Sequence, residues 1–224
     1  MKKILYLVLI SILVSSCGPG RYTRMEQYPA MYQEHPGTIL IMSPINNTQH
    51  PDAGDILYSS LAHPLVDAGY YVVSPFIVGD AFTGVNGYKS EDYIEGGLKV
   101  FNQKYGADAV LFTVIEYWFK YGAGISTKIR YVLRSAHTGE ILFDRTNSMT
   151  HDLSITTGFG SNLGLLIDVA GTVVNTFATD YVYAARASNM YVFKDLPRGK
   201  YSPEYMKDQE APARKNNQNA IHFR

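Results

Sequence analysis

Residues 38–44, with the sequence TILIMSP, and residues 70–76, with the sequence YYVVSPF, decide the fold of this chain. The first is a continuous apolar and β-branched run ending at Ser-Pro, which is typical of a strand buried on both faces of a sheet. The second predicts another strand. Between them, apolar residues recur at helical spacing from Ile56 to Ala68. Strand, helix and strand within about forty residues predict a right-handed crossover between parallel neighbours.

The expected helix between these strands has recognisable ends. Asp52 is suited to the N-cap, and Asp55 three residues later can complete a capping-box-like pair. Pro64 removes one backbone donor and is expected to kink the last turn, and Gly69 is suited to the C-terminal cap. Asn46-Asn47-Thr48 predicts the turn that leaves the first strand.

The next part of the chain predicts one more helix and an antiparallel end to the sheet. The expected elements are a helix at 90–105 weakened by glycines 96 and 97, a strand at 109–119, and a hairpin of strands 125–135 and 141–144 about a tight turn at 137–140. The fold class is therefore α/β, with a mixed sheet of about five strands packed with helices.

A long C-terminal helix is expected from Ser161 to about Ser188, because apolar residues form one wide helical stripe there. A membrane span is disfavoured, since charged residues such as Asp168 and Asp180 interrupt the run. Small residues at Gly160, Gly164 and Gly171, with Asp168, lie near one face of this helix. They suggest the hypothesis that the protein dimerises through it.

The N-terminus has the features of a bacterial lipoprotein signal. Lys2 and Lys3 precede an apolar run of about ten residues, half of the roughly twenty that a membrane span requires. Val14-Ser15-Ser16-Cys17 then resembles the lipobox, in which the cysteine receives a lipid before cleavage. Residues 1–16 are thus the expected signal peptide and Cys17 the expected lipidation site. The alternative is a free or buried thiol after an ordinary signal peptide.

Residue composition predicts how the chain is divided after the signal peptide. Residues 17–36 are expected to form a lipidated tether, residues 37–190 the α/β domain with its long helix, and residues 191–224 a flexible tail rich in Pro, Lys, Arg, Asn and Gln. Gly18 stands where an aspartate would resemble the inner-membrane retention signal. We therefore expect anchoring in the outer membrane with the body in the periplasm, a surface-exposed body being the alternative.

Composition and motifs favour neither an enzyme nor a nucleic-acid-binding protein. Lys and Arg together number 20, as do Asp and Glu, so no basic patch is indicated. The six histidines are dispersed without metal-site spacing, which predicts no metal, and each is interpreted as structural or solvated. Gly158-Phe159-Gly160-Ser161 lacks a phosphate-loop lysine, and no Gly-x-Ser-x-Gly elbow occurs. We expect no cofactor.

Four stretches resemble one known family: PINNT at 44–48, PLVDAGYYV at 64–72, YGADAVL at 105–111 and TGEIL at 138–142. It is the family of bacterial lipoproteins of unknown function called the GNA-type antigen lipoproteins, and the resemblance covers about Thr38–Ala185. These proteins are similar to the amino-terminal domain of TolB and, more distantly, to the periplasmic domain of CsgG. That similarity implies an α/β sandwich and assembly in the envelope, and it implies no catalytic residue.

The sequence therefore predicts a non-enzymatic, membrane-anchored lipoprotein. We expect a homodimer or other homo-oligomer with an unknown envelope protein partner, acting as an accessory of a transport, export or surface-assembly system. The alternative is a CsgG-like secretion-channel subunit, in which residues 125–153 or the long helix would insert on oligomerisation.

Overall fold

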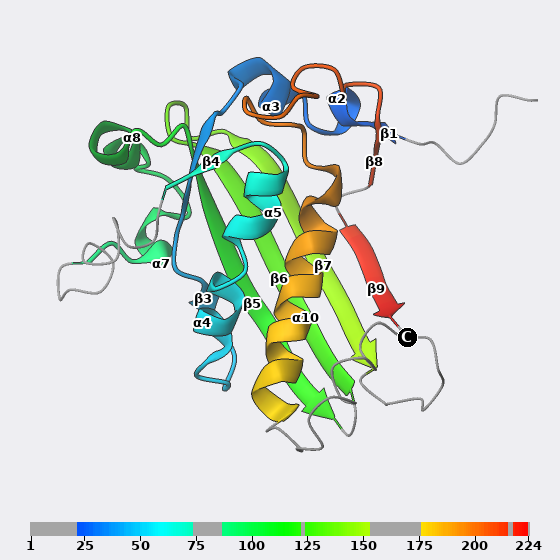
Figure 1. Ribbon diagram of the computed structural model, residues 1–224. Coiled ribbons are helices and arrows are strands. Elements are labelled where there is room, and N and C mark those ends of the chain that lie inside the picture. The colour runs from blue at the N-terminus through cyan, green and yellow to red at the C-terminus, as the bar shows by residue number, and fades with distance from the viewer. Residues whose placement is uncertain (1–21, 74–86, 122–123, 153–175, 215–216, 224) are drawn as a thin grey trace, which may run out of the picture.

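A mixed sheet forms the centre of the molecule in the computed structural model, which describes residues 22–73, 87–121, 124–152, 176–214 and 217–223 (Figure 1). Its strand order is β4-β2-β5-β6-β7-β9, with β3 also paired to β5. The strands are β2 (Thr38–Ile41), β3 (Ile45–Asn46), β4 (Tyr71–Val72), β5 (Ala109–Tyr121), β6 (Gly124–Ser135), β7 (Ile141–Asp152) and β9 (Asn217–Phe223).

The pairing confirms the α/β fold class and the predicted topology. β2 is parallel to both β4 and β5, and β5, β6 and β7 are joined by antiparallel pairing. The sheet has seven strands, where about five were expected. Two strands also differ in extent from the sequence prediction. β7 has 12 residues, well beyond the expected end at Asp144, and part of the expected exit turn, Asn46, pairs with Ile115 as the end of β3.

Helices cover both faces of the sheet and create two apolar cores. On one face, α4 (Ala53–Tyr58), α5 (Ala62–Asp67) and α10 (Thr176–Val192) pack over the strands (Figure 1). On the other face, α8 (Lys99–Tyr105) lies near the start of β5, and α7 (Ser90–Tyr93) begins just past the end of β2, where the hydroxyl of Ser90 donates to the carbonyl of Ser43. Alternate residues of a strand point to opposite faces, so Leu111 belongs to the first core and Phe112 to the second.

A β-bulge in β5 keeps the larger core continuous. The register of β5 against β6 shifts between Ile115 and Tyr117, so Glu116 is an extra residue. Without it, strict alternation would turn Trp118 away from the face that buries Ile115. With it, Ile115 and Trp118 both belong to the core beneath α10.

Each of the two helices predicted near the start of the domain is broken into two. The segment after Asp52 forms α4 and α5, and Asp52 makes no side-chain capping bond, so the expected capping box does not form. Pro64 lies in the first turn of α5, where its missing N–H costs no helical bond, so the prediction of a kink in the last turn was wrong. Gly69 ends α5 as predicted, with φ of 91°. The amides of Gly69 and Tyr70 donate to Val66 and Leu65, as in a Schellman motif.

The helix expected at 90–105 is interrupted at its glycines, because Gly97 adopts φ of 76° and ends the helical path. The long C-terminal helix is described only from Thr176, and it continues to Val192, beyond the expected end at Ser188. Its expected first half, with the small residues at 160–171, lies outside the described residues. Among the residues described, no helix combines the length and the apolarity that a membrane span needs.

The predicted tether and flexible tail were wrong for most of their length. From residue 22 the chain forms β1 (Tyr22–Thr23), α2 (Arg24–Gln27) and α3 (Pro29–Glu34). After α10 it forms a short 3-10 helix, η1 (Phe193–Asp195), then β8 (Pro212–Ala213) and β9. Composition indicated disorder because these segments are polar, but they are stabilised by contacts with each other that local composition cannot reveal.

Candidate anchor and interaction sites

The N-terminal segment of the described chain binds a segment that follows α10. We call this arrangement the clasp: residues 22–34 held against residues 195–214. β1 pairs antiparallel with β8, with Tyr22 opposite Ala213. The amide of Arg24 donates to the carbonyl of Ala211 at 2.9 Å, and that of Met25 to the carbonyl of Gln209 at 3.1 Å. Figure 1 shows this region at one end of the sheet, over the turn that joins β6 to β7.

A buried ion pair lies inside the clasp. Arg24 Nη1 is 2.5 Å from Asp208 Oδ2, and their side chains are only 10% and 5% exposed. The same carboxylate accepts from the hydroxyl of Tyr32 at 3.1 Å and from the amide of Arg198 at 2.9 Å. A buried charge is tolerated only when it is paired and hydrogen-bonded, and Asp208 meets both conditions.

A second buried ion pair joins the clasp to the sheet. Arg145, on β7, donates to both oxygens of Asp195, at 2.5 and 3.0 Å, and also donates to the hydroxyl of Tyr28. The amide of Arg214 donates to Asp195 at 2.7 Å. Burial alone would raise the pKa of Asp195, but the hydrogen bonds and charge of Arg145 hold it below its ordinary value. Burial raises the pKa of Tyr28, so this hydroxyl stays neutral.

Close backbone contacts position the C-terminal half of the clasp on α5. The amide of Gly199 donates to Ala68 at 2.8 Å, that of Tyr201 to Gly69 at 2.9 Å, and the hydroxyl of Tyr70 donates to Pro197 at 2.6 Å. A Cβ at Gly199 would lie 2.4 Å from the carbonyl oxygen of Gly69. Only glycine therefore fits at position 199.

One signal for the clasp was present in the sequence and was missed. Thr23 and Glu26 form a reciprocal capping box, in which the amide of Glu26 donates to Thr23 at 3.2 Å and the amide of Thr23 donates to Glu26 at 2.8 Å. The pattern Thr-x-x-Glu predicts a helix start, and Pro29 is suited to the first turn of the next helix. These two signals argue against a structureless tether.

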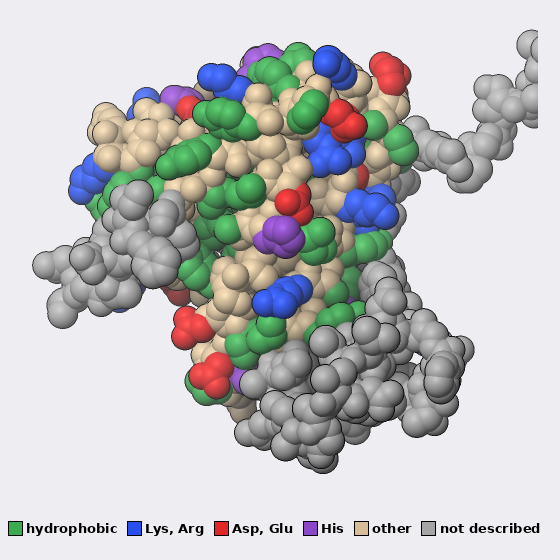
Figure 2. All heavy atoms as spheres, in the orientation of Figure 1, with side chains coloured by type: hydrophobic (Ala, Val, Ile, Leu, Met, Phe, Trp, Pro, Cys, Tyr) green, Lys and Arg blue, Asp and Glu red, His purple; other side chains and the backbone are tan. Residues whose placement is uncertain are grey.

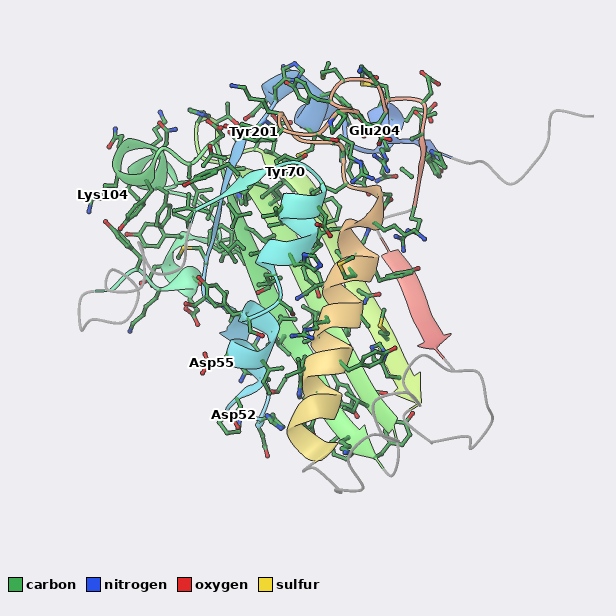
Figure 3. All side chains as sticks on the ribbon, in the orientation of Figure 1. Asp52, Asp55, Tyr70, Lys104, Tyr201 and Glu204 are labelled. Atoms are coloured by element: carbon green, nitrogen blue, oxygen red, sulfur yellow. The ribbon has the colours of Figure 1, made fainter. Side chains whose placement is uncertain are left out.

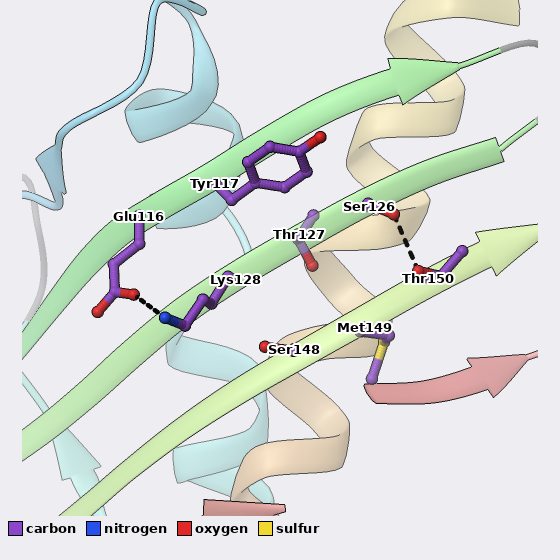
Figure 4. A pocket seen from close by; sticks show the side chains of 8 residues that line it. All are labelled: Glu116, Tyr117, Ser126, Thr127, Lys128, Ser148, Met149 and Thr150. Carbon is purple, nitrogen blue, oxygen red and sulfur yellow. Dashed lines mark hydrogen bonds and ion pairs between the residues drawn. The ribbon is translucent and has the colours of Figure 1, made fainter. Parts of the chain in front are cut away.

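The sheet face opposite α10 carries a second candidate site near the far ends of β5 and β6. Tyr117, Phe119 and Tyr121 follow one another on this face of β5, and they are 47%, 52% and 49% exposed. Beside them is a shallow hollow of about 390 Å³ lined by residues of β5, β6 and β7, which are Glu116, Tyr117, Ser126, Thr127, Lys128, Ser148, Met149 and Thr150 (Figure 4).

Polar side chains of this hollow interact with one another. Lys128 Nζ is 2.6 Å from Glu116 Oε2, and the hydroxyls of Ser126 and Thr150 are 2.9 Å apart (Figure 4). The cation is therefore paired and the hydroxyls satisfy each other. The lining residues include neither His nor Cys, and the ammonium of Lys128 is paired with the carboxylate of Glu116.

The structure leaves the described histidines apart. His35 ends α3, His50 packs on the ring of Tyr181, His63 pairs with Asp67, and His137 pairs with Asp108. The side chain of His222 is not described. Within the described ranges, no group of three or more His, Cys, Asp or Glu could hold a metal ion. Cys17 and the Gly158–Ser161 loop lie outside the described residues.

His151 is buried in β7, with its ring 5.8 Å from that of Tyr183, and burial lowers its pKa from 6.5 to about 4. The unfolded chain therefore takes up a proton near pH 6.5 that the folded chain resists until about pH 4. The stability that neutral His151 contributes is complete above pH 6.5 and is lost as the pH falls towards 4.

We expect the free energy of unfolding to decrease by roughly 3 kcal/mol across this window. Urea denaturation at pH 7.5, 5.5 and 4.5 measures it. His151→Gln, which cannot titrate, should show a flatter profile even if it is less stable at neutral pH. Equal pH dependence in the two proteins would contradict the assignment to His151.

Comparison with known proteins gives the family. The model of the family described as "Putative lipoprotein GNA1162-like" matches residues 26–198, which is most of the chain. The chain belongs to this family. The match runs from within α2 to Arg198, so it begins earlier than the resemblance found in the sequence and stops before β8 and β9. The similarity to TolB and CsgG stays a prediction.

A curated relative and several solved structures are similar to this family member. The "Putative lipoprotein NMB1124/NMB1162" of Neisseria meningitidis serogroup B is 28% identical over 198 residues, covering 84% of this chain and 89% of the relative. The crystal structure of lipoprotein GNA1162 from Neisseria meningitidis is 23% identical, with a TM-score of 0.47, covering 59% of this chain and 91% of that one. A PelC dodecamer from Paraburkholderia phytofirmans is 16% identical, with a TM-score of 0.45, covering 73% and 89%.

Proposed function

We propose that this lipoprotein is a non-enzymatic envelope accessory, anchored by a lipid on Cys17 in the outer membrane with its body in the periplasm. The observation that carries the proposal is the lipobox-like sequence Val14–Cys17 in a chain that belongs to a lipoprotein family. Acyl chains on the anchoring residue hold the body at a membrane, because each buried methylene contributes about 0.8 kcal/mol.

The described surfaces support a role in binding rather than in catalysis. The hollow beside Tyr117 is shallow and offers hydroxyls and a Lys128 that is already paired with Glu116. On the face over α5 and α10, acidic, basic and apolar side chains are interspersed, without a basic patch that would attract nucleic acid (Figure 2). We propose that the protein self-associates and that it serves a transport, export or surface-assembly system through a protein partner.

Replacing the lipidated residue tests the anchor. We expect Cys17→Ser, expressed with an ordinary cleavable signal peptide in place of residues 1–16, to move from the membrane fraction to the soluble periplasmic fraction, because the signal is still removed but the acyl chains can no longer be attached. Its melting temperature should not change, since serine replaces the thiol by a hydroxyl of similar size. The measurement is fractionation of cells in high salt, with Ser15→Ala, which keeps a small residue in the lipobox, as the matched control. Retention of Cys17→Ser in the membrane would contradict the proposal.

Crosslinking in intact cells tests the partnership. The expected products are a homo-oligomer and an adduct with at least one envelope protein, recovered with the wild-type chain and reduced with the released Cys17→Ser form. Recovery of the monomer alone would count against the accessory role. Conductance of the purified protein in planar bilayers would instead favour the secretion-channel alternative.

A further inference from the structure

We infer that the clasp end of the domain is held against the lipid surface, with the far ends of β5 and β6 pointing away from it. The partner is a lipid bilayer, and the inference rests on the proposed lipidation of Cys17. It corrects the idea of a body that moves freely on a long tether. Three features support it: the clasp is rigid, the link from Cys17 to the clasp is short, and the strands extend from the clasp to the opposite end of the domain.

The first described residues after the anchor cannot move independently of the core. Tyr22 and Thr23 are paired with β8, and Arg24 is held by its buried ion pair with Asp208. The C-terminal half of the clasp is in turn fixed to the sheet through Asp195 and Arg145, whose side chains are 7% and 4% exposed. A force on Tyr22 is therefore transmitted to the whole domain.

The link between anchor and clasp is short. Only four residues, 18–21, separate Cys17 from Tyr22. Five residue steps span at most about 18 Å even when fully extended. A tether reaching to Pro36 would instead allow an end-to-end distance of up to about 70 Å. The clasp therefore cannot leave the neighbourhood of the lipid headgroups.

The long strands of the sheet extend from the clasp to the opposite end of the domain. Asp108, just before β5, accepts from the amides of Gly37 and Thr38, which follow α3 directly, and Thr138 donates to Glu34 in α3. The beginning of β5 is thus at the clasp end. The strand has 13 residues, so its other end at Tyr121 lies about 40 Å farther along. Figure 1 shows this direction plainly, with the clasp at one end and the end of β5 and the start of β6 at the other.

The exposed side chains at the clasp end suit a lipid interface. Tyr22 and Met25 are each 39% exposed, and Tyr201 is 66% exposed. Tyrosine has an apolar body and a polar tip, which suits the boundary between headgroups and acyl chains. Figure 3 places Tyr201 and Glu204 at the same end of the molecule as α2 and α3. The exposed Lys200 and Lys207 are balanced by Glu204 and Glu210, so the inference does not depend on lipid charge.

Energy transfer to the membrane tests this orientation. The lipidated full-length chain is prepared with a single new cysteine, Met25→Cys, Tyr201→Cys or Tyr121→Cys, which is the only free thiol because the native cysteine is acylated. Each variant is labelled with a donor dye and inserted into phosphatidylethanolamine–phosphatidylglycerol vesicles that carry a headgroup acceptor. Flotation of the vesicles is measured first. A protein that fails to float refutes the anchor, and hence the proposed function, independently of orientation.

For protein that floats, we expect transfer from positions 25 and 201 to be at least about twofold more efficient than from position 121, given the length of β5. Equal efficiencies, or the reverse order, would overturn the inference while leaving the anchor intact. A flexible Gly-Ser insert of about fifteen residues between Arg21 and Tyr22 should reduce the difference without lowering the melting temperature. If the difference in transfer efficiency between these positions were unchanged by the insert, the short link would not be what orients the domain.

Discussion

Asp195→Ala is expected to destabilise the protein by about 3–5 kcal/mol, because it leaves Arg145 as a buried charge without its partner. The side chain of Arg145 is only 4% exposed, and two of its hydrogen bonds go to this carboxylate. The amide of Arg214 loses its acceptor as well. The measurement is the free energy of unfolding from urea denaturation at neutral pH.

The adjacent strand position provides the matched control. Asp144 lies next to Arg145 on β7 but faces the other side of the sheet, where it pairs with Arg130 at 2.6 Å. Those two side chains are 31% and 42% exposed, so Asp144→Ala should cost no more than about 1 kcal/mol. If the free energy of unfolding decreased by a similar amount in both variants, burial would not determine how strongly these ion pairs stabilise the fold.

Gly199→Ala is expected to cost about 3 kcal/mol or to detach the C-terminal half of the clasp. The new Cβ would lie 2.4 Å from one backbone atom of Gly69 and 2.7 Å from another, and backbone cannot rotate away as a side chain can. The bond from the amide of Gly199 to Ala68 would be displaced with it. Urea denaturation gives the loss, and protection of the Tyr201 amide from hydrogen exchange reports detachment.

Gly96→Ala is the control for Gly199→Ala, because nothing lies within 4 Å of a Cβ at that position. Its expected effect is neutral or slightly stabilising, since alanine restricts the unfolded chain. If Gly199→Ala were equally benign, the close approach of residue 199 to the end of α5 would not be a constraint on the fold.

Regular elements were predictable from the sequence where local patterns decide them. The run at 38–42 became β2, the alternation of 125–135 became β6, and Gly139 takes φ of 79° in the hairpin turn. The bulge at Glu116 was not predictable, because it leaves no mark on an apolar run that is buried along most of its length. The helix breaks at residues 59–61 and 94–98 also depend on packing against the sheet.

The clasp could not be predicted because its contacts are distant in sequence and polar in character. Arg24 and Asp208 are 184 residues apart, and Arg145 and Asp195 are 50 apart. No spacing rule connects such pairs, and a polar segment resembles a disordered one by composition. The anchor is the opposite case. The lipobox-like residues around Cys17 are visible only in the sequence, since they lie outside the described structure.

The separation of Arg24 from Asp208 also sets the order of folding. Residues 22–34 are synthesised first, but their partners at 195–214 are among the last to be synthesised. Closing so long a loop costs conformational entropy before any contact compensates for it. The end of the domain nearest to the anchor therefore completes its structure last. A chain that ends before Asp208 lacks the acceptor for Arg24, so neither half of the clasp can form this ion pair without the other.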